Sequence, residues 1–198
     1  MRPLFLLPAV FVLLLPKLAI AQSLRYPTET ELADLIQTFR LRIPQLMQTG
    51  YYTDRRTADE RQQREAQVAA WAEVDGAIAP FLGEWMALEE SLAIFPAQNP
   101  GEVCVIDSAL EESDFYRGSI VDDKVYTDVG LVFVLDSGFL GSTFVTNNGA
   151  GLYEYANPLP MSDPSTSQYY QQYQPAMIER FQAAGCRIEI AAKGVAEQ

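Results

Sequence analysis

The spacing of apolar residues changes near residue 84, and this change predicts two kinds of structure in one chain. Before it, two stretches repeat their apolar positions three and four residues apart, which is helical spacing. After it, short apolar runs alternate with turn residues such as Asn-Pro-Gly and Asn-Gly, which is typical of an antiparallel sheet. The pattern therefore predicts an α+β fold in which helices precede the sheet.

Two N-terminal helices are predicted from their start signals. The sequence Thr-Glu-Thr-Glu from Thr28 forms a capping box, and a second box begins at Thr57. Pro44 should kink or restart the first helix, because proline has no N–H to donate within a helix. We expect residues 22–83 to form an N-terminal helical segment, with two antiparallel helices joined by residues 51–56.

The rest of the chain predicts a curved antiparallel sheet or a small barrel of about seven strands. The predicted strands are 91–95, 102–107, 115–121, 124–129, 131–135, 139–146 and 152–155. A helix at residues 167–184 and a closing strand at 187–191 follow them. Residues 84–198 are therefore expected to form one antiparallel β domain with a C-terminal helix and strand.

The N-terminus has the three-part layout of a secretory signal peptide. A positive start at Arg2 precedes an apolar run, and the small residues Ala19 and Ala21 flank Ile20. The apolar run is shorter than the roughly 20 residues of a membrane-spanning helix, which disfavours the alternative of an uncleaved anchor. We expect residues 1–21 to be removed and no stable membrane span to remain. The mature chain is then exported, to a bacterial periplasm or to an extracellular or lumenal space.

Export would place Cys104 and Cys186 in an oxidising compartment, where two thiols in a small domain usually pair. A disulfide closing a loop of this length stabilises the fold by roughly 4 kcal/mol in the chain-entropy model. It would join an early strand to the closing strand. A reactive or metal-binding thiol is the alternative, disfavoured because the chain has no Cys-x-x-Cys pair and no histidine.

Charge and composition exclude several functions. The chain has 14 Lys and Arg, 26 Asp and Glu, and no histidine, which gives a net charge of −12. Removal of residues 1–21 deletes two basic groups and no acid, so the mature charge becomes −14. Nucleic acid is not an expected partner, because its phosphates need clustered cations. The absence of imidazole excludes Ser-His-Asp and Cys-His catalysis, and neither a metal nor a cofactor is predicted.

Residues 84–136 are strongly acidic, with twelve carboxylates against Arg117 and Lys124. None of these acids fits the spacing of a calcium loop, so a solvated surface is the favoured interpretation. Paired carboxylates can also cleave a glycosidic bond without histidine or thiol. The alternative function is therefore a carboxylate-based hydrolase of extracellular glycans, which requires two of these acids to converge in one cleft.

Tyrosines supply the candidate ligand contacts. Tyr153 and Tyr155 share one face of a predicted strand, and further tyrosines at 169, 170 and 173 precede or begin the last helical turns. Tyrosine offers a ring for contact and a hydroxyl for orientation, as small ligands and carbohydrates require. The alternative is that these rings only pack the sheet and helix ends, since tyrosine is favoured in strands.

The segment Gly83-Glu84-Trp85 resembles the Gly-x-Trp opening of lipocalins, which also close with a helix and a last short strand. The resemblance covers three residues and an order of elements, and the strands predicted here are shorter than those of lipocalin barrels. It assigns no family. Trp85 is predicted to be a large core aromatic near the first strand, and it joins Tyr153 and Tyr155 as a candidate ligand-binding residue.

These patterns favour an exported, non-catalytic binding or protein-interaction module. Its partner would be a small molecule or an envelope protein, held on the concave face of the sheet or on the acidic middle segment. This hypothesis predicts an apolar or tyrosine-lined cavity without buried acid pairs. Four arginines make the start of the second helix basic, so head-to-tail contact with the acidic sheet of another copy is a further possibility. These are Arg55, Arg56, Arg61 and Arg64.

Overall fold

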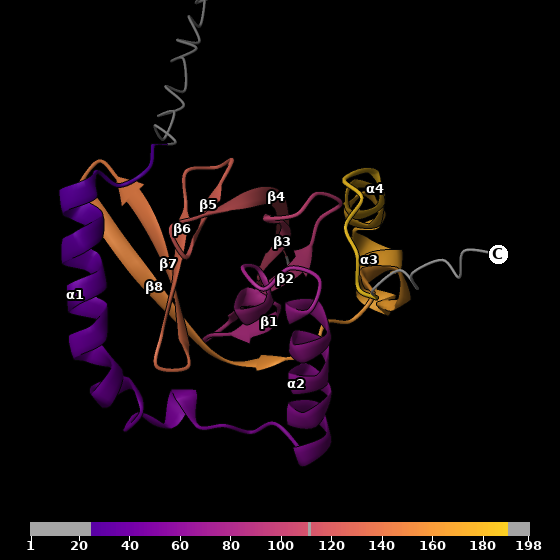
Figure 1. Ribbon diagram of the computed structural model, residues 1–198, viewed down its shortest axis with the longest axis horizontal. Coiled ribbons are helices and arrows are strands. Elements are labelled where there is room, and N and C mark those ends of the chain that lie inside the picture. The colour runs from indigo at the N-terminus through magenta and orange to yellow at the C-terminus, as the bar shows by residue number, and fades with distance from the viewer. Residues whose placement is uncertain (1–24, 111, 190–198) are drawn as a thin grey trace, which may run out of the picture.

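The computed structural model describes residues 25–110 and 112–189, so the predicted signal peptide lies outside the described residues. Its centre is a closed antiparallel barrel in which each strand pairs with the next and the last pairs with the first (Figure 1). The strands are β1 (Gly83–Met86), β2 (Glu90–Pro96), β3 (Glu102–Ala109), β4 (Glu112–Val121), β5 (Lys124–Thr127), β6 (Val132–Asp136), β7 (Phe139–Thr146) and β8 (Gly149–Leu159). The barrel has eight strands where about seven were predicted.

The additional strand is β1, which closes the barrel through an irregular seam. Glu84 pairs with Leu159 and Met86 with Ala156, and the register shifts between these two pairs. Gly83 has a positive φ of 124°, and a Cβ at this position would lie only 2.7 Å from the carbonyl oxygen of Leu159. Glycine is therefore required where β1 meets β8.

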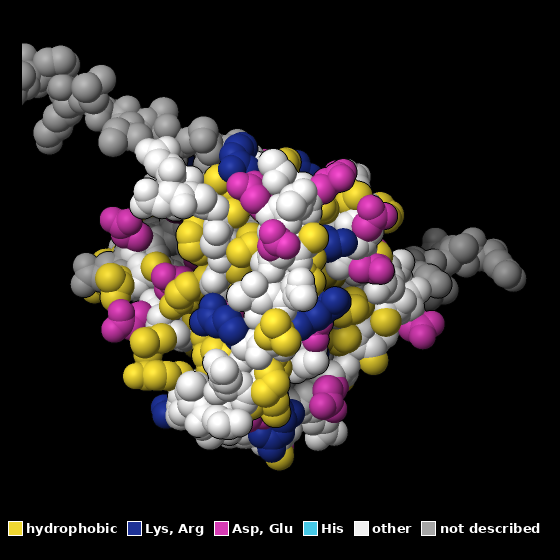
Figure 2. Space-filling model, turned by 90° about the vertical axis from the view of Figure 1, so that its left-hand side faces the viewer, with side chains coloured by type: hydrophobic (Ala, Val, Ile, Leu, Met, Phe, Trp, Pro, Cys, Tyr) yellow, Lys and Arg dark blue, Asp and Glu magenta, His cyan; other side chains and the backbone are white. Residues whose placement is uncertain are grey.

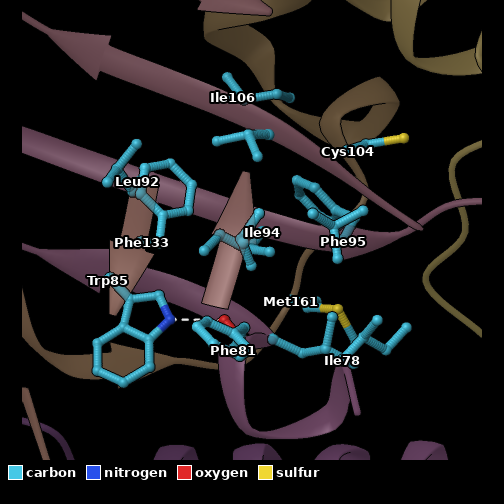
Figure 3. Close-up of a cluster of buried hydrophobic side chains, with 14 of the residues drawn as sticks. Ile78, Phe81, Trp85, Leu92, Ile94, Phe95, Cys104, Ile106, Phe133 and Met161 are labelled. Atoms are coloured by element: carbon cyan, nitrogen blue, oxygen red, sulfur yellow. Dashed lines mark hydrogen bonds between the residues drawn. The ribbon is translucent and has the colours of Figure 1, made fainter. Parts of the chain in front are cut away.

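Side chains fill the middle of the barrel. Strand side chains alternate between the two faces of a sheet, so every second residue points inward. Trp85 is opposite Leu92 on the inner face, and Ile94 and Phe133 are buried in the same cluster (Figure 3). Leu140 is also buried in this cluster. The concave face of the sheet, one of the two predicted ligand surfaces, is consequently occupied by the core of the protein itself.

One end of the barrel is closed by the chain that precedes β1, and we call it the plugged end. The 3-10 helix η2 (Ala79–Phe81) brings Ile78 and Phe81 beneath the barrel, where Met161 joins them after β8 (Figure 3). The indole N–H of Trp85 donates a 2.7 Å hydrogen bond to the carbonyl oxygen of Phe81. This bond and the apolar contacts fix η2 to the first strand.

The two predicted N-terminal helices are confirmed as α1 (Glu29–Leu46) and α2 (Ala58–Ala72), each with the predicted capping box. Pro44 lies inside the last turn of α1. They do not pack together as a hairpin: α1 covers β7 and β8, whereas α2 contacts η2 and β8 (Figure 1). The apolar stripe of α1, including Phe39 and Ile43, lies in a cluster with Val132 and Val134 on the outer face of the barrel.

The C-terminal part lies on the opposite side of the barrel from α1 (Figure 1). Instead of one helix at 167–184, the structure has η3 (Pro164–Thr166), α3 (Gln168–Tyr173) and α4 (Pro175–Ala183). The break falls at Pro175, which cannot donate to the preceding turn. The expected closing strand is wrong for residues 187–189, which form no strand, and its last two residues lie outside the described part.

The predicted disulfide is confirmed. Cys104 and Cys186 are joined by an S–S bond of 2.02 Å across a sequence separation of 82 residues. Cys104 points outward from β3, and Cys186 follows α4 rather than lying in a strand. The rings of Phe95 and Phe181 pack edge to face beside the bridge, with centroids 4.9 Å apart. The disulfide therefore attaches the C-terminal helices to the outer face of the barrel.

No helix among the described residues combines the length and the apolar character needed to cross a membrane.

Candidate functional site

The end of the barrel opposite the plug carries tyrosines and carboxylates, and we call it the polar end. Asp107 and Asp114 are directly opposite each other on β3 and β4, so both side chains lie on the inner face. The hydroxyl of Tyr116 donates to Asp107 Oδ2 at 3.0 Å, and that of Tyr155 donates to Glu90 Oε2 at 3.1 Å. Three acids of the middle segment therefore gather at this end.

Burial sets the protonation of this cluster. It raises the pKa of Asp107, the neighbouring carboxylates Glu90 and Asp114 raise it further, and the hydrogen bond from Tyr116 opposes them. Burial also raises the pKa of Tyr116 and of Tyr155, with nearby carboxylates adding to the effect. Both tyrosines are therefore protonated at neutral pH and remain donors to the carboxylates.

The three predicted ligand residues lie in two places. Tyr153 and Tyr155 are neighbours on the inner face of β8, with ring centroids 5.3 Å apart, and the Tyr153 hydroxyl donates to the carbonyl oxygen of Leu88. Trp85 is a buried core residue, as predicted. It also lines a surface cleft together with Arg64. The ligand-binding role of all three stays a prediction.

A connector between α1 and α2, residues 47–57, crosses the outer face of β8. The Tyr52 hydroxyl donates to the carbonyl oxygen of Glu154, and the Asn157 side chain donates to that of Tyr52, both at 3.0 Å. Arg56 Nη1 donates to the carbonyl oxygen of Pro158 at 2.9 Å. Burial raises the pKa of Tyr52 to about 12, so its hydroxyl remains a donor. These bonds hold the connector against β8 and leave a cleft on each side of it.

The first of these, the connector cleft, has a volume of about 410 Å³. Its wall contains unusually exposed apolar side chains: Tyr51 is 71% exposed, Leu88 55% and Met86 36%. Arg55 reaches the same cleft, and no ion pair of Arg55 occurs within residues 25–110 and 112–189. The cleft thus combines an apolar wall with Arg55, a cation that forms no ion pair in the described part of the chain.

The second cleft, about 570 Å³, is lined by three arginines and by Trp85. Arg56 and Arg61 share Asp54, with ion pairs of 2.9 and 3.6 Å. Arg64 donates to the carbonyl oxygens of Pro80 and Leu82 and lies 5.7 Å from the centre of the Trp85 ring. Burial lowers the pKa of Arg64. Most of these donors are used within the protein, so the arginines act mainly as clamps that tie the connector to β8 and α2 to the segment of η2 and Leu82.

On the face that carries α1, basic and acidic side chains lie among hydrophobic ones (Figure 2). Arg40 pairs with Asp136, and Arg42 Nη1 lies 2.6 Å from Glu154 Oε1, a contact without hydrogen-bond alignment. Burial raises the pKa of Glu154, and Arg42 opposes this effect. These pairs attach α1 to the barrel wall.

Within the described part of the chain, no three Cys, Asp or Glu residues are placed to hold a metal ion together. Comparisons with protein-family models, with curated proteins and with solved structures gave no match to the chain.

Sequence reasoning missed the gathering of Glu90, Asp107 and Asp114 and the connector cleft. The two-residue period of β3 and β4 could have placed Asp107 and Asp114 on inward faces, but only the strand register makes them neighbours.

Proposed function

We propose that this protein is an exported, non-catalytic binding module that holds a small amphipathic anion in the connector cleft. The observation that carries the proposal is the convergence of Tyr51, Met86 and Leu88 with Arg55 in one cleft of about 410 Å³. A ligand covering these side chains removes apolar surface from water, which favours binding by roughly 25 cal/mol per Å² before the costs of association. An anionic group on the ligand would neutralise Arg55.

Two features favour this cleft over the barrel interior. The interior is filled by buried residues such as Leu92 and Phe133, whereas the cleft wall is exposed to solvent. The carboxylates that line the cleft, Glu60 and Glu89, come from separate elements, and Glu60 is engaged in the capping box of α2. Of the two arginines that line the cleft, Arg56 is paired with Asp54, so the cleft offers contact surface and Arg55 rather than a paired acid and base.

The fluorescent probe 8-anilinonaphthalene-1-sulfonate tests the proposal, because it combines aromatic rings with one sulfonate. We expect saturable binding at one site. The exchanges Leu88→Ala and Tyr51→Ala should each weaken binding about tenfold, which corresponds to roughly 1.4 kcal/mol. Arg55→Gln should weaken it several-fold and abolish its dependence on salt.

Leu41→Ala provides the matched control, since Leu41 is 70% exposed on α1 and does not line the cleft. It should bind the probe as the unmodified chain does. Equal affinity in Leu88→Ala and the unmodified chain, or an equal loss in Leu41→Ala, would contradict the proposal.

A glycan hydrolase remains the second candidate, and the polar end is the observation that favours it. Acid–base cleavage needs one carboxyl with a raised pKa beside another that is ionised, and Asp107 lies opposite Asp114 and near Glu90. The half-buried acids Asp107 and Glu90 also depart from what the binding hypothesis predicts. We prefer binding because Tyr116 and Tyr155 already occupy two of these carboxylates. Turnover of a neutral glycan that disappears in both Asp107→Asn and Glu90→Gln would establish the hydrolase instead.

A further inference from the structure

We propose a second, independent ligand site for a neutral saccharide, in the groove between the outer face of β2–β3 and the segment formed by η3 and α3. The groove has a volume of about 320 Å³. Its lining includes Glu84, Ser91, Ser108, Leu110, Tyr169 and Tyr170. It shares no lining residue with the connector cleft, so the two proposals can fail separately.

The floor of the groove carries two serine hydroxyls among the apolar side chains of Ala93, Phe95 and Ile106. Ser91 of β2 is directly opposite Ser108 of β3, so both hydroxyls lie on the outer face of the barrel. Ser108 Oγ lies 2.9 Å from Ser113 Oγ and 3.1 Å from the hydroxyl of Tyr170. A hydroxyl can donate and accept at the same time, so this row suits a ligand whose own hydroxyls do both.

Aromatic rings form one wall of the groove. The rings of Tyr169 and Tyr170 lie 5.4 Å apart, and Tyr173 extends the row at 5.8 Å from Tyr169. Leu110, which follows β3 and is 82% exposed, borders the groove from the barrel side. A sugar ring has an apolar C–H face and a polar edge, so a tyrosine ring can cover the face while nearby hydroxyls bind the edge.

The charges of the groove exclude other ligand classes. Among the lining residues the single charged side chain is Glu84, and none is a cation. A phosphate or sulfate would meet a carboxylate here, on a chain with a net charge of −12. A wholly apolar ligand would cover the hydroxyls of Ser91 and Ser108 without offering them a hydrogen-bond partner. A neutral polyhydroxylated ligand carries no charge that Glu84 would repel, and its hydroxyls can form hydrogen bonds with Ser91 and Ser108.

Calorimetric titration with cellohexaose and with maltohexaose tests the site, with a chondroitin sulfate hexasaccharide as the charged comparison. We expect at least one neutral hexasaccharide to bind with a Kd below about 1 mM and the sulfated one not to bind. Tyr169→Ala should weaken binding about tenfold, and Ser108→Ala several-fold. Ser91→Leu, which fills the floor of the groove, should abolish it.

Two variants serve as matched controls: Tyr51→Ala removes an exposed tyrosine elsewhere, and Ser119→Ala removes an exposed serine on β4. Both should bind the saccharide normally. Absence of binding by both neutral hexasaccharides, tighter binding of the sulfated one, or an equal affinity in Tyr169→Ala and Tyr51→Ala would overturn the proposal. Ser91 and Tyr169 lie in different elements, so a folding defect in one variant does not affect the other. Either Ser91→Leu or Tyr169→Ala, if it folds, is enough to test the site.

Discussion

The two ends of the barrel are closed by different chemistry. At the plugged end, Ile78, Phe81 and Met161 cover the interior with apolar side chains. At the polar end, Tyr116 and Tyr155 cover it with rings whose hydroxyls are bonded to Asp107 and Glu90. Apolar closure stabilises the fold at any pH, whereas closure by carboxylates makes stability depend on protonation. The plugged end is therefore expected to carry more of the stability, and the polar end more of the pH response.

The largest effect is expected from Phe81→Ala. Phe81 is 3% exposed in the core cluster, and removing its ring leaves a cavity where η2 closes the barrel. A change of this kind costs about 3–5 kcal/mol. Urea unfolding, followed by tryptophan fluorescence, measures the loss.

Phe144→Ala is the matched control for this change, because Phe144 is 40% exposed near the end of β7. It should cost much less, since less apolar surface is returned to water. Equal losses in the two variants would show that the plugged end does not dominate the stability.

Tyr116→Phe should have the next largest effect. The ring stays in place, but the half-buried carboxylate of Asp107 loses the hydroxyl that donates to it at 3.0 Å. Leaving a buried polar group without its partner costs about 1–3 kcal/mol. The same unfolding experiment at pH 7 measures it, and recovery in the double variant Tyr116→Phe/Asp107→Leu would confirm that the unpaired carboxylate is the cause. A Tyr116→Phe variant as stable as the unmodified chain would show that this hydrogen bond does not stabilise the polar end.

Much of the fold was predictable where the signal is local. The capping boxes at Thr28 and Thr57, the turn-bounded strands and the placement of Tyr153 and Tyr155 on one strand face depend on residues a few positions apart. The disulfide followed from the predicted export signal and the presence of two cysteines. These features need no knowledge of the tertiary structure.

The rest depends on contacts between distant segments. An amphipathic stripe shows that α1 buries one face but not that the partner is β6–β8 instead of α2. β1 is only four residues long and has no apolar run, so its pairing with β2 and β8 makes it a strand. The connector cleft likewise arises from hydrogen bonds between residues about 100 positions apart.

The smallest of the three effects, a change in the pH dependence of stability, separates the two ends most directly. Burial raises the pKa of Asp107 in the folded protein above its unfolded value of about 3.9. The folded state therefore binds this proton more tightly than the unfolded state does. The resulting stabilisation is fully present below the unfolded pKa and is lost as the pH rises through the folded pKa.

Asp107→Asn removes this titration while keeping an oxygen that can accept from Tyr116. Between pH 4 and pH 7, the free energy of unfolding of the variant should rise relative to that of the unmodified chain. Asp122→Asn, in the exposed turn between β4 and β5, is the control. The difference in its free energy of unfolding from that of the unmodified chain should stay constant over this pH range. If the free energy of unfolding of Asp107→Asn also changed with pH as that of the unmodified chain does, Asp107 would not contribute to the pH dependence of stability. The two ends of the barrel would then differ in polarity alone.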